Sequence, residues 1–110
     1  METITVNGKV YYSEQLKEIE NGDKAHSFLT VGEIYSFRTV TMIYVGRLIA
    51  ISKQEFLIED AAWIAETERW ADFVKEGNAK EVEPYCNAVV LNRGAMLDIT
   101  LFPKLLRDQK

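Results

Sequence analysis

The sequence contains few of the residues that build metal centres, disulfides and nucleophilic active sites. Its 110 residues include one cysteine, Cys86, and one histidine, His26. A single cysteine excludes a disulfide within the chain, as is typical of proteins kept in reducing compartments. Together, one histidine and one cysteine also exclude a tetrahedral zinc site built by one chain. We therefore expect no metal site and no cofactor.

Long apolar runs and an excess of basic residues are also missing. The longest strongly apolar run, 42–51, is interrupted by Gly46 and Arg47 and is far shorter than the roughly 20 residues that cross a bilayer. The first residues lack the pattern of a signal peptide, so we predict a cytoplasmic protein without membrane contact. A net charge of −4 and a pI near 5.0 argue against binding a DNA or RNA polymer. One or two arginines would still suffice for a small anionic ligand.

The composition that is present suits a soluble globular domain, with 47% hydrophobic and 27% charged residues. No linker, low-complexity tract or internal repeat divides the chain, so we predict a single domain over residues 1–110. Within it we expect an N-terminal hairpin and short helix in 1–35, a sheet core with one amphipathic helix in 36–102, and a C-terminal turn in 103–110.

The N-terminal segment carries clear turn and capping signals. Asn7-Gly8 lies between two alternating segments and favours a β-hairpin, because both residues tolerate the positive φ of a type I′ turn. Ser13 is a suitable N-cap for a short helix that ends at Asn21-Gly22.

Residues 36–51 alternate as a β-strand that contains two arginines. The strand should begin near Glu33 and place one set of side chains on a single face, namely Tyr35, Phe37, Thr39, Thr41, Ile43 and Val45. Arg38 then lies on the other face, whereas Arg47 would project among apolar neighbours, which is unfavourable for an unpaired guanidinium. Gly46 suggests a β-bulge whose one-residue slip turns Arg47 to the side of Arg38. We therefore expect both arginines to face away from the main core.

The rest of the chain predicts more antiparallel strands and one more helix. Ser52 to Glu55 should form a turn that leads into a returning strand, and the helix in 67–77 should have Thr67 as its N-cap and Gly77 as its stop. Two apolar strands should lie on either side of residues 92–94, which form either the tight connection of a closing hairpin or a bulge, and a turn should begin at Pro103. The fold class is α+β, with an antiparallel, partly rolled sheet of five to seven strands and two or three short helices.

Catalytic residues are scarce. His26 has no partner that would make it a general base, and Cys86 suits a small buried hydrophobic residue. A group of carboxylates could hold a hard cation or act in acid–base chemistry, although such groups on loops are usually solvated: Glu59, Asp60, Glu66 and Glu68. No glycine-rich phosphate loop is present. We expect a protein that is not an enzyme.

Four arginines lie close in sequence to aromatic residues. They are Arg38, Arg47, Arg69 and Arg93, and the aromatic residues include Trp63 and Tyr85. Guanidinium groups bind phosphate oxygens bidentately and aromatic rings stack on bases, so this mixture predicts an anionic, nucleotide-like ligand. Asn92 would then hydrogen-bond a base edge or a ribose. The alternative is that the arginines pair with the surplus of acidic residues while the tryptophans fill the core.

The order of these segments resembles a known family. Arg38-Thr39 on a strand, a strand with a central glycine, "EDAAW", a tryptophan-bearing helix that ends at glycine, and a final "VVLNRGAMLDI" are similar to small phage and prophage proteins related to the first type of Thoeris anti-defence sponges. The similarity covers residues 36–102. Its Arg-Thr motif falls on Arg38 and Thr39, and its aspartate-alanine motif on Asp60 and Ala61. Where the family has two arginines next, this chain has Ala62 and Trp63.

The resemblance implies a phage protein of the host bacterial cytosol that sequesters an immune signal without catalysis. Such sponges bind cyclic ADP-ribose isomers, and relatives bind cyclic oligonucleotides, at sites between the protomers of a dimer or larger homo-oligomer. Two alternatives come from the residues themselves. One is an acidic module that inhibits a host or defence protein or belongs to a virion. The other is a hydrolase with a metal on Glu59 or Asp60.

Overall fold

The computed structural model describes residues 3–6, 9–12 and 28–110, with side chains from residue 28 onward. β1 (Thr3–Val6) and β2 (Lys9–Tyr12) pair antiparallel, with Val6 opposite Lys9. This pairing confirms the predicted N-terminal hairpin. The predicted helix over 13–22, the turn at Asn7-Gly8 and His26 lie outside the described residues.

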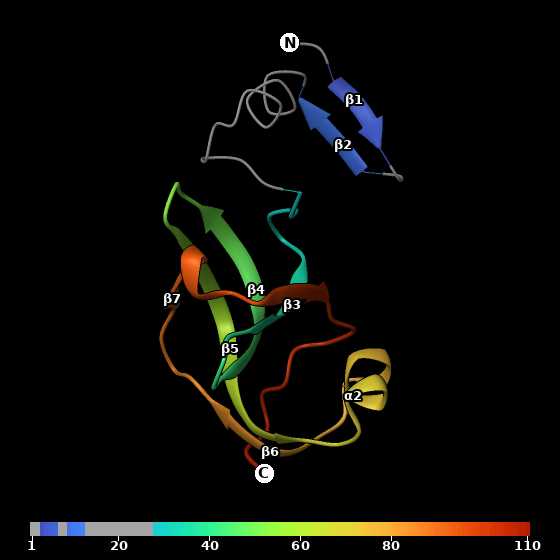
Figure 1. Cartoon of the computed structure of the whole chain (residues 1–110), viewed down its shortest axis with the longest axis vertical. Helices are drawn as coiled ribbons and strands as arrows, with labels where there is room; N and C mark the ends of the chain where they lie inside the picture. The colour runs from blue at the N-terminus through green and yellow to red at the C-terminus, as the bar shows by residue number, and fades with distance from the viewer. Residues whose placement is uncertain (1–2, 7–8, 13–27) are drawn as a thin grey trace.

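The main part of the described chain is an antiparallel sheet with one helix (Figure 1). Its strands are β3 (Ile34–Arg38), β4 (Ile43–Ile51), β5 (Glu55–Thr67), β6 (Ala79–Pro84), β7 (Val89–Asn92) and β8 (Asp98–Leu101). The helix is α2 (Trp70–Glu76), and a short 3-10 turn, η1 (Arg93–Ala95), follows β7.

The long strand β5 is paired along both of its edges. The described residues form a six-stranded sheet in the order β6-β5-β4-β3-β8, with β7 off this path. β6 and β7 pair with the same edge of β5, β6 with its second half and β7 with its first half. This open sheet confirms the predicted α+β class. One helix and one 3-10 turn are found in the described part of the chain, because the other predicted helix lies outside it.

The predicted single strand through residues 36–51 is wrong. The chain turns back at 39–42, so that β3 and β4 form a hairpin in which Arg38 lies opposite Ile43 and Ile34 opposite Arg47. The Thr39 backbone N–H donates to the Met42 carbonyl at 2.8 Å. Thr39 and Thr41 continue the alternation of the flanking residues, which is why periodicity alone joined the two strands.

The irregularity near Gly46 is real, but its extra residue lies on β5. Val45 pairs with Ala62 and Arg47 with Glu59, so β5 contains one more residue than β4 between these pairs. Asp60 adopts a positive φ of 50° there, a conformation that aspartate tolerates better than most residues. The bulge therefore bends β5, and the 39–42 turn, not a slip at Gly46, places Arg47 on the same face as Arg38.

The bulge lets β5 contribute to two apolar clusters on opposite faces of the sheet. The first cluster comprises Tyr35, Phe37, Leu48, Phe56, Ile58, Ala61 and Leu91. The second cluster comprises Val45, Ala62, Ile64, Phe73, Ala79, Val82 and Phe102. Ile58 and Ile64 would share a face in a regular strand, and the extra residue between them sends them to different clusters.

Helix α2 packs over the second cluster and ends as predicted. Phe73 is fully buried against Phe102, with ring centroids 4.7 Å apart. Gly77 ends the helix in the left-handed region, with φ of 78°, and its N–H donates to Phe73. The helix begins at Trp70, after Arg69. The prediction of Thr67 as N-cap is therefore wrong, because β5 extends to Thr67 and needs its backbone for pairing.

The C-terminal half contains one strand more than predicted, and its last two strands do not form a hairpin. β6 was missed because its alternating charged residues resemble a loop. β7 pairs with β5, whereas β8 crosses to the far side of the sheet and pairs with β3. The predicted closing hairpin is therefore wrong, and β8 becomes an end strand. Among the described residues, no helix is long and apolar enough to cross a membrane.

Candidate functional site

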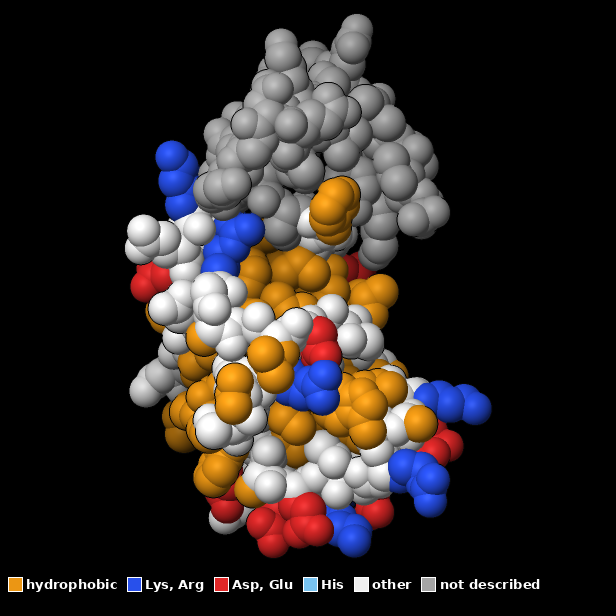
Figure 2. Space-filling view, viewed as in Figure 1, with side chains coloured by type: hydrophobic (Ala, Val, Ile, Leu, Met, Phe, Trp, Pro, Cys, Tyr) orange, Lys and Arg blue, Asp and Glu red, His pale blue; other side chains and the backbone are white. Residues whose placement is uncertain are grey.

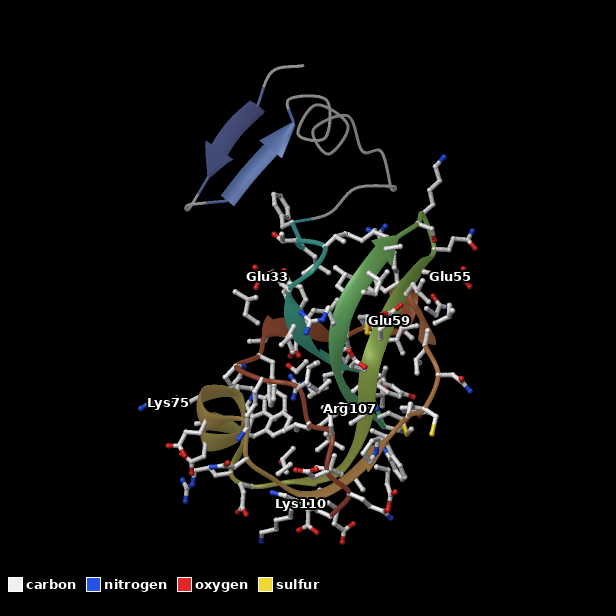
Figure 3. All side chains as sticks on the ribbon, turned by 180° about the vertical axis from the view of Figure 1, so that it is seen from behind. Glu33, Glu55, Glu59, Lys75, Arg107 and Lys110 are labelled. Carbon is white, nitrogen blue, oxygen red and sulfur yellow. The ribbon has the colours of Figure 1, made fainter. Side chains whose placement is uncertain are left out.

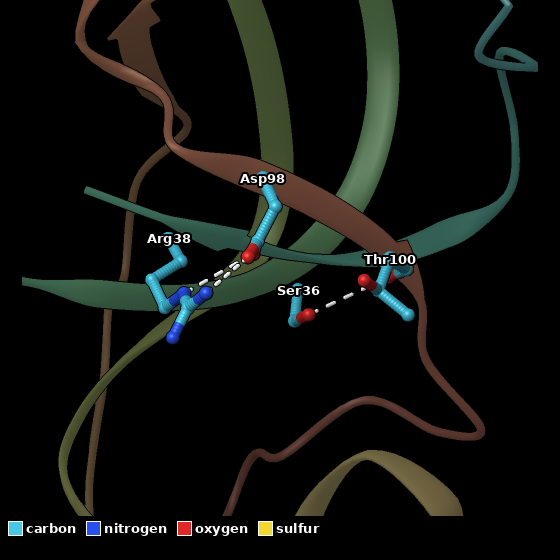
Figure 4. A network of polar contacts seen from close by, with 4 residues as sticks. All are labelled: Ser36, Arg38, Asp98 and Thr100. Atoms are coloured by element: carbon cyan, nitrogen blue, oxygen red, sulfur yellow. Dashed lines mark hydrogen bonds and ion pairs between the residues drawn. The ribbon is translucent and has the colours of Figure 1, made fainter. Parts of the chain in front are cut away.

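Arg38 is held between β8 and α2. Its Nε donates to Asp98 Oδ1 at 3.2 Å, and its Nη2 also bonds Asp98 Oδ2, as Figure 4 shows. The guanidinium carbon lies 4.8 Å from the Trp70 ring centroid. This geometry combines a bidentate ion pair with a cation–π contact. Arg38 thus agrees with the alternative prediction, in which the arginines pair with acidic residues of the same chain.

Two further predicted ligand residues stabilise local turns. The Thr39 hydroxyl accepts from the Met42 backbone N–H at 2.9 Å and so closes the β3–β4 turn. The Asn92 side chain accepts from the Gly94 N–H at 2.9 Å and so caps η1. Short polar side chains commonly satisfy backbone groups at turns in this way.

The remaining predicted arginines lie on different elements, with Arg47 on β4, Arg69 directly before α2 and Arg93 in η1. Arg47 donates to the Gly32 carbonyl at 3.2 Å. Arg47 lies on the same face of the sheet as Arg38. The cross-strand pairs Arg38–Ile43 and Ile34–Arg47 are nevertheless four positions apart along the strands, or about 13 Å. Arg93 donates to the Ser52 carbonyl at 2.5 Å and lies 5.2 Å from the Phe56 ring centroid. Arg69 is exposed beside α2.

The predicted aromatic residues, by contrast, are brought together. Trp63 lies directly opposite Tyr44 in the β4–β5 ladder. The Tyr44 and Tyr85 rings are tilted by 33° with centroids 6.3 Å apart. Burial raises the pKa of Tyr44, and the neighbouring Tyr85 raises it further through charge repulsion and a hydrogen bond. We call Tyr44, Trp63 and Tyr85 the aromatic group.

The predicted carboxylates lie along β5 and in Glu68, which follows it. No group of three or more His, Cys, Asp and Glu side chains with metal-binding geometry occurs in the described ranges. A surface hollow of about 430 Å³ is lined largely by carboxylates, which repel phosphate: Glu68, Asp72, Glu76, Asn78, Ala79 and Lys110. Glu66 lies opposite Glu81 in the β5–β6 ladder. Figure 2 shows acidic side chains gathered at the end of the molecule where β6 lies.

Arg107 was not singled out from the sequence. Its guanidinium donates to the Ala61 carbonyl at 2.6 Å and to the Tyr85 carbonyl at 2.9 Å. These carbonyls lie at the β5 bulge and directly after β6, and Figure 3 shows Arg107 beside that part of the sheet. It lies within the predicted C-terminal turn, 103–110, where no periodic pattern marks a role for it.

One candidate binding surface is the outer edge of β8. In the described part of the chain, β8 pairs with β3 alone. Leu97, directly before the strand, is 60% exposed, and Leu101 at its end is 52% exposed. Val40 on the β3–β4 turn is 81% exposed. The alternation of apolar and polar residues over 97–101 predicts a strand, but not that the strand ends the sheet.

The outer edge of β6 is protected. Val82 exchanges two backbone hydrogen bonds with the C-terminal residue Lys110, at 3.0 and 3.3 Å. β6 also has the sequence AKEVEP, with exposed charges and a terminal proline. Covering segments, charges and proline are the usual means of blocking an edge.

Comparison of the chain with known protein families, curated proteins and solved structures finds no match. Trp63 and Tyr85 both lie next to Tyr44, whereas Arg38 and Arg47 lie four positions apart along their strands.

Proposed function

We propose that the protein acts by binding another polypeptide along the outer edge of β8, without catalysis. The observation that supports this most strongly is an end strand flanked by the exposed side chains of Leu97 and Leu101. An unpaired edge offers backbone N–H and C=O groups to an extended segment, which binds as an added strand.

Features of β8 favour addition of a strand. Its pairing with β3 has a continuous register from Arg38–Asp98 to Tyr35–Leu101, so no bulge twists the edge away. Its sequence is DITL, without lysine or proline. Asp98, its charged residue, is paired with Arg38. Within the part of the chain that the structure describes, β8 thus carries none of the protections found on β6.

Side-chain positions indicate the kind of segment that fits. Ile99 and Leu101 lie opposite Phe37 and Tyr35, so they extend the face of the first cluster toward the edge. Leu97 has the same strand parity. An incoming segment with apolar residues at alternate positions would cover this face, while its backbone pairs with β8.

A peptide selection tests the proposal. The purified chain is used to select from a displayed library of random ten-residue peptides, and selected peptides are titrated against variants. We expect enrichment of alternating apolar and polar peptides whose affinity falls at least tenfold in the Leu97→Lys/Leu101→Lys variant. Val90→Lys is the matched control, because Val90 is an exposed apolar residue on β7. Selected peptides that bind the double variant as tightly as the natural chain would rule the edge out.

Sequestration of a cyclic nucleotide signal by a phage protein in a bacterial cytosol is the second candidate. The observation that favours it is the aromatic group, whose half-buried rings could stack on a base. The guanidinium that lies beside this group in the same chain is that of Arg107, which donates to the Tyr85 carbonyl at 2.9 Å. Calorimetric titration with cyclic ADP-ribose isomers and cyclic di- and trinucleotides should give binding that Tyr85→Ala weakens, with intact ligand recovered after heat denaturation. No heat from any of these ligands would end this candidate.

A further inference from the structure

We propose that the segment added to β8 is β8 of a second copy of this chain, antiparallel and related by a two-fold axis at Ile99. This proposal rests on the proposed function of the β8 edge, and it names the partner.

The pattern of residues 97–101 is self-complementary. Leu97, Ile99 and Leu101 are apolar and alternate with Asp98 and Thr100. An antiparallel pair centred on Ile99 places Leu97 opposite the partner's Leu101, Ile99 opposite the partner's Ile99, and Asp98 opposite the partner's Thr100. Cross-strand partners share a face, so both exposed leucines become covered and no like charges oppose each other.

Neighbouring registers are less favourable. Centring the axis on Asp98 would place two carboxylates directly opposite each other, which is destabilising. With the axis on Thr100, Asp98 would lie opposite the partner's Phe102, whose side chain is buried in the second cluster. In the same register Leu97 would lie opposite the partner's Pro103, which has no backbone N–H to donate. If the register between the two β8 strands shifted by a single residue, the apolar side chains of one strand would lie opposite polar side chains of the other. The Ile99-centred register is therefore selected.

The resulting dimer is isologous, because the same edge is used by both copies. It joins the two sheets through β8. Since β8 has only four residues, the interface is small, and we expect a weak dimer that forms in the range of about 10 to 1,000 µM.

Sedimentation velocity of the full chain tests the association. Across this concentration range we expect the sedimentation coefficient to rise from the monomer value to the dimer value. The Leu97→Lys/Leu101→Lys variant should stay monomeric, and the Val90→Lys control should behave as the natural chain. Both leucines are exposed in a single copy, so the variant should keep its fold, which far-ultraviolet circular dichroism checks.

Disulfide trapping tests the register. In a Cys86→Ser background, chains with Leu97→Cys and chains with Leu101→Cys are mixed and oxidised with oxidised glutathione. The Ile99-centred pair places these positions opposite each other, within the distance a disulfide spans. We expect a mixed disulfide dimer in high yield. Each single variant alone should give little, because its two cysteines would be separated by four positions, about 13 Å.

The outcomes separate this proposal from the proposed function. A chain that stays monomeric throughout, yet selects edge-dependent peptides, overturns the second copy and leaves the binding role of β8. A monomeric chain that selects no such peptides overturns both. A dimer that forms equally well in the Leu97→Lys/Leu101→Lys variant, or that crosslinks best within one single variant, also overturns this proposal.

Discussion

Individual arginine side chains hold together places where the sheet bends or ends. Arg107 bridges the carbonyls of Ala61 and Tyr85, Arg93 reaches the turn at Ser52, and Arg38 joins β3 to β8 and α2. A guanidinium has five N–H donors in a planar fork, so one side chain can satisfy several acceptors. These arginine side chains thus bond to backbone carbonyls and to a carboxylate of the same chain.

Replacing Arg38 tests its contribution to stability. Arg38→Gln removes the pairing with Asp98 and the contact with Trp70. The ion pair is 38% and 41% exposed at its two side chains, so solvent screening limits the loss to about 1 kcal/mol of unfolding free energy. Urea denaturation measures it, with Arg69→Gln as the exposed control. No loss relative to Arg69→Gln would contradict the assigned role.

Gly46 is required by the close approach of the β5 bulge. A Cβ at this position would lie 3.0 Å from Ile58 Cδ1 and 3.3 Å from the Cα of Ala61. We therefore expect Gly46→Ala to lower the unfolding free energy by about 1–3 kcal/mol through overpacking. Gly94→Ala is the matched control, because its Cβ would meet only the Asn92 side chain at an ordinary 3.4 Å. Equal effects of the two substitutions in urea denaturation would refute this packing argument.

Tyr44 should titrate above the ordinary tyrosine value. Burial raises its pKa first, and Tyr85 adds to the shift. Because the folded pKa exceeds the unfolded value of about 10, the stabilisation is fully present below pH of about 10 and is lost as pH rises through the folded pKa. Carbon-13 NMR of the tyrosine rings measures this titration. Tyr85→Phe should reduce the shift without abolishing it, and an unchanged pKa in that variant would contradict the coupling.

At the scale of elements, sequence patterns predicted most strands and the pairings β1–β2 and β4–β5, but not the pairings of β7 and β8. The hairpin β1–β2, the returning strand β5 and the Gly77 helix stop follow from local chemistry, since Asn-Gly turns and a left-handed glycine need no distant partner. The β3–β4 turn was missed because Thr39 and Thr41 continue a strand alternation. The partner of β8 depends on a contact across about 60 residues, which no local pattern encodes.

Local sequence patterns also did not predict which residues of the candidate site lie close together. Trp63 or Tyr85 was predicted to stack on a base, and both residues lie next to Tyr44. The arginines were grouped by proximity in sequence and residue type, but their strand positions separate them. Asp98, the partner of Arg38, lies in a strand whose neighbour could not be predicted, so the ion pair was not expected.

Arg107 should stabilise the element boundary between β6 and β7. Arg107→Met removes two hydrogen bonds to backbone carbonyls while keeping an unbranched side chain. We expect a loss of about 1 kcal/mol in unfolding free energy, since Arg107 is partly solvated. Lys104→Met, an exposed cation in the same C-terminal segment, is the control. A loss no greater than that of Lys104→Met would show that the bridge is dispensable.

At the scale of the whole molecule, the sheet has contrasting edges. The β6 edge carries exposed Glu81 and Glu83 and is closed by Lys110, whereas β8 is flanked by exposed leucines and, in the described part of the chain, pairs with β3 alone. β7 likewise pairs with β5 alone among the described strands. Acidic charge at one end favours solubility and discourages pairing there. Of the two end strands β6 and β8, β8 is therefore the one that can extend the sheet by pairing with another strand.

Hydrogen exchange of the natural chain at low and high protein concentration tests this account most directly. Peptides covering residues 96–102 should exchange more slowly at about 1,000 µM than at about 10 µM, because pairing of β8 protects its outward N–H groups. The β7 peptide, residues 89–92, is the internal control and should not change. Equal exchange of the β8 peptide at both concentrations would contradict the claim that this edge pairs with a second copy.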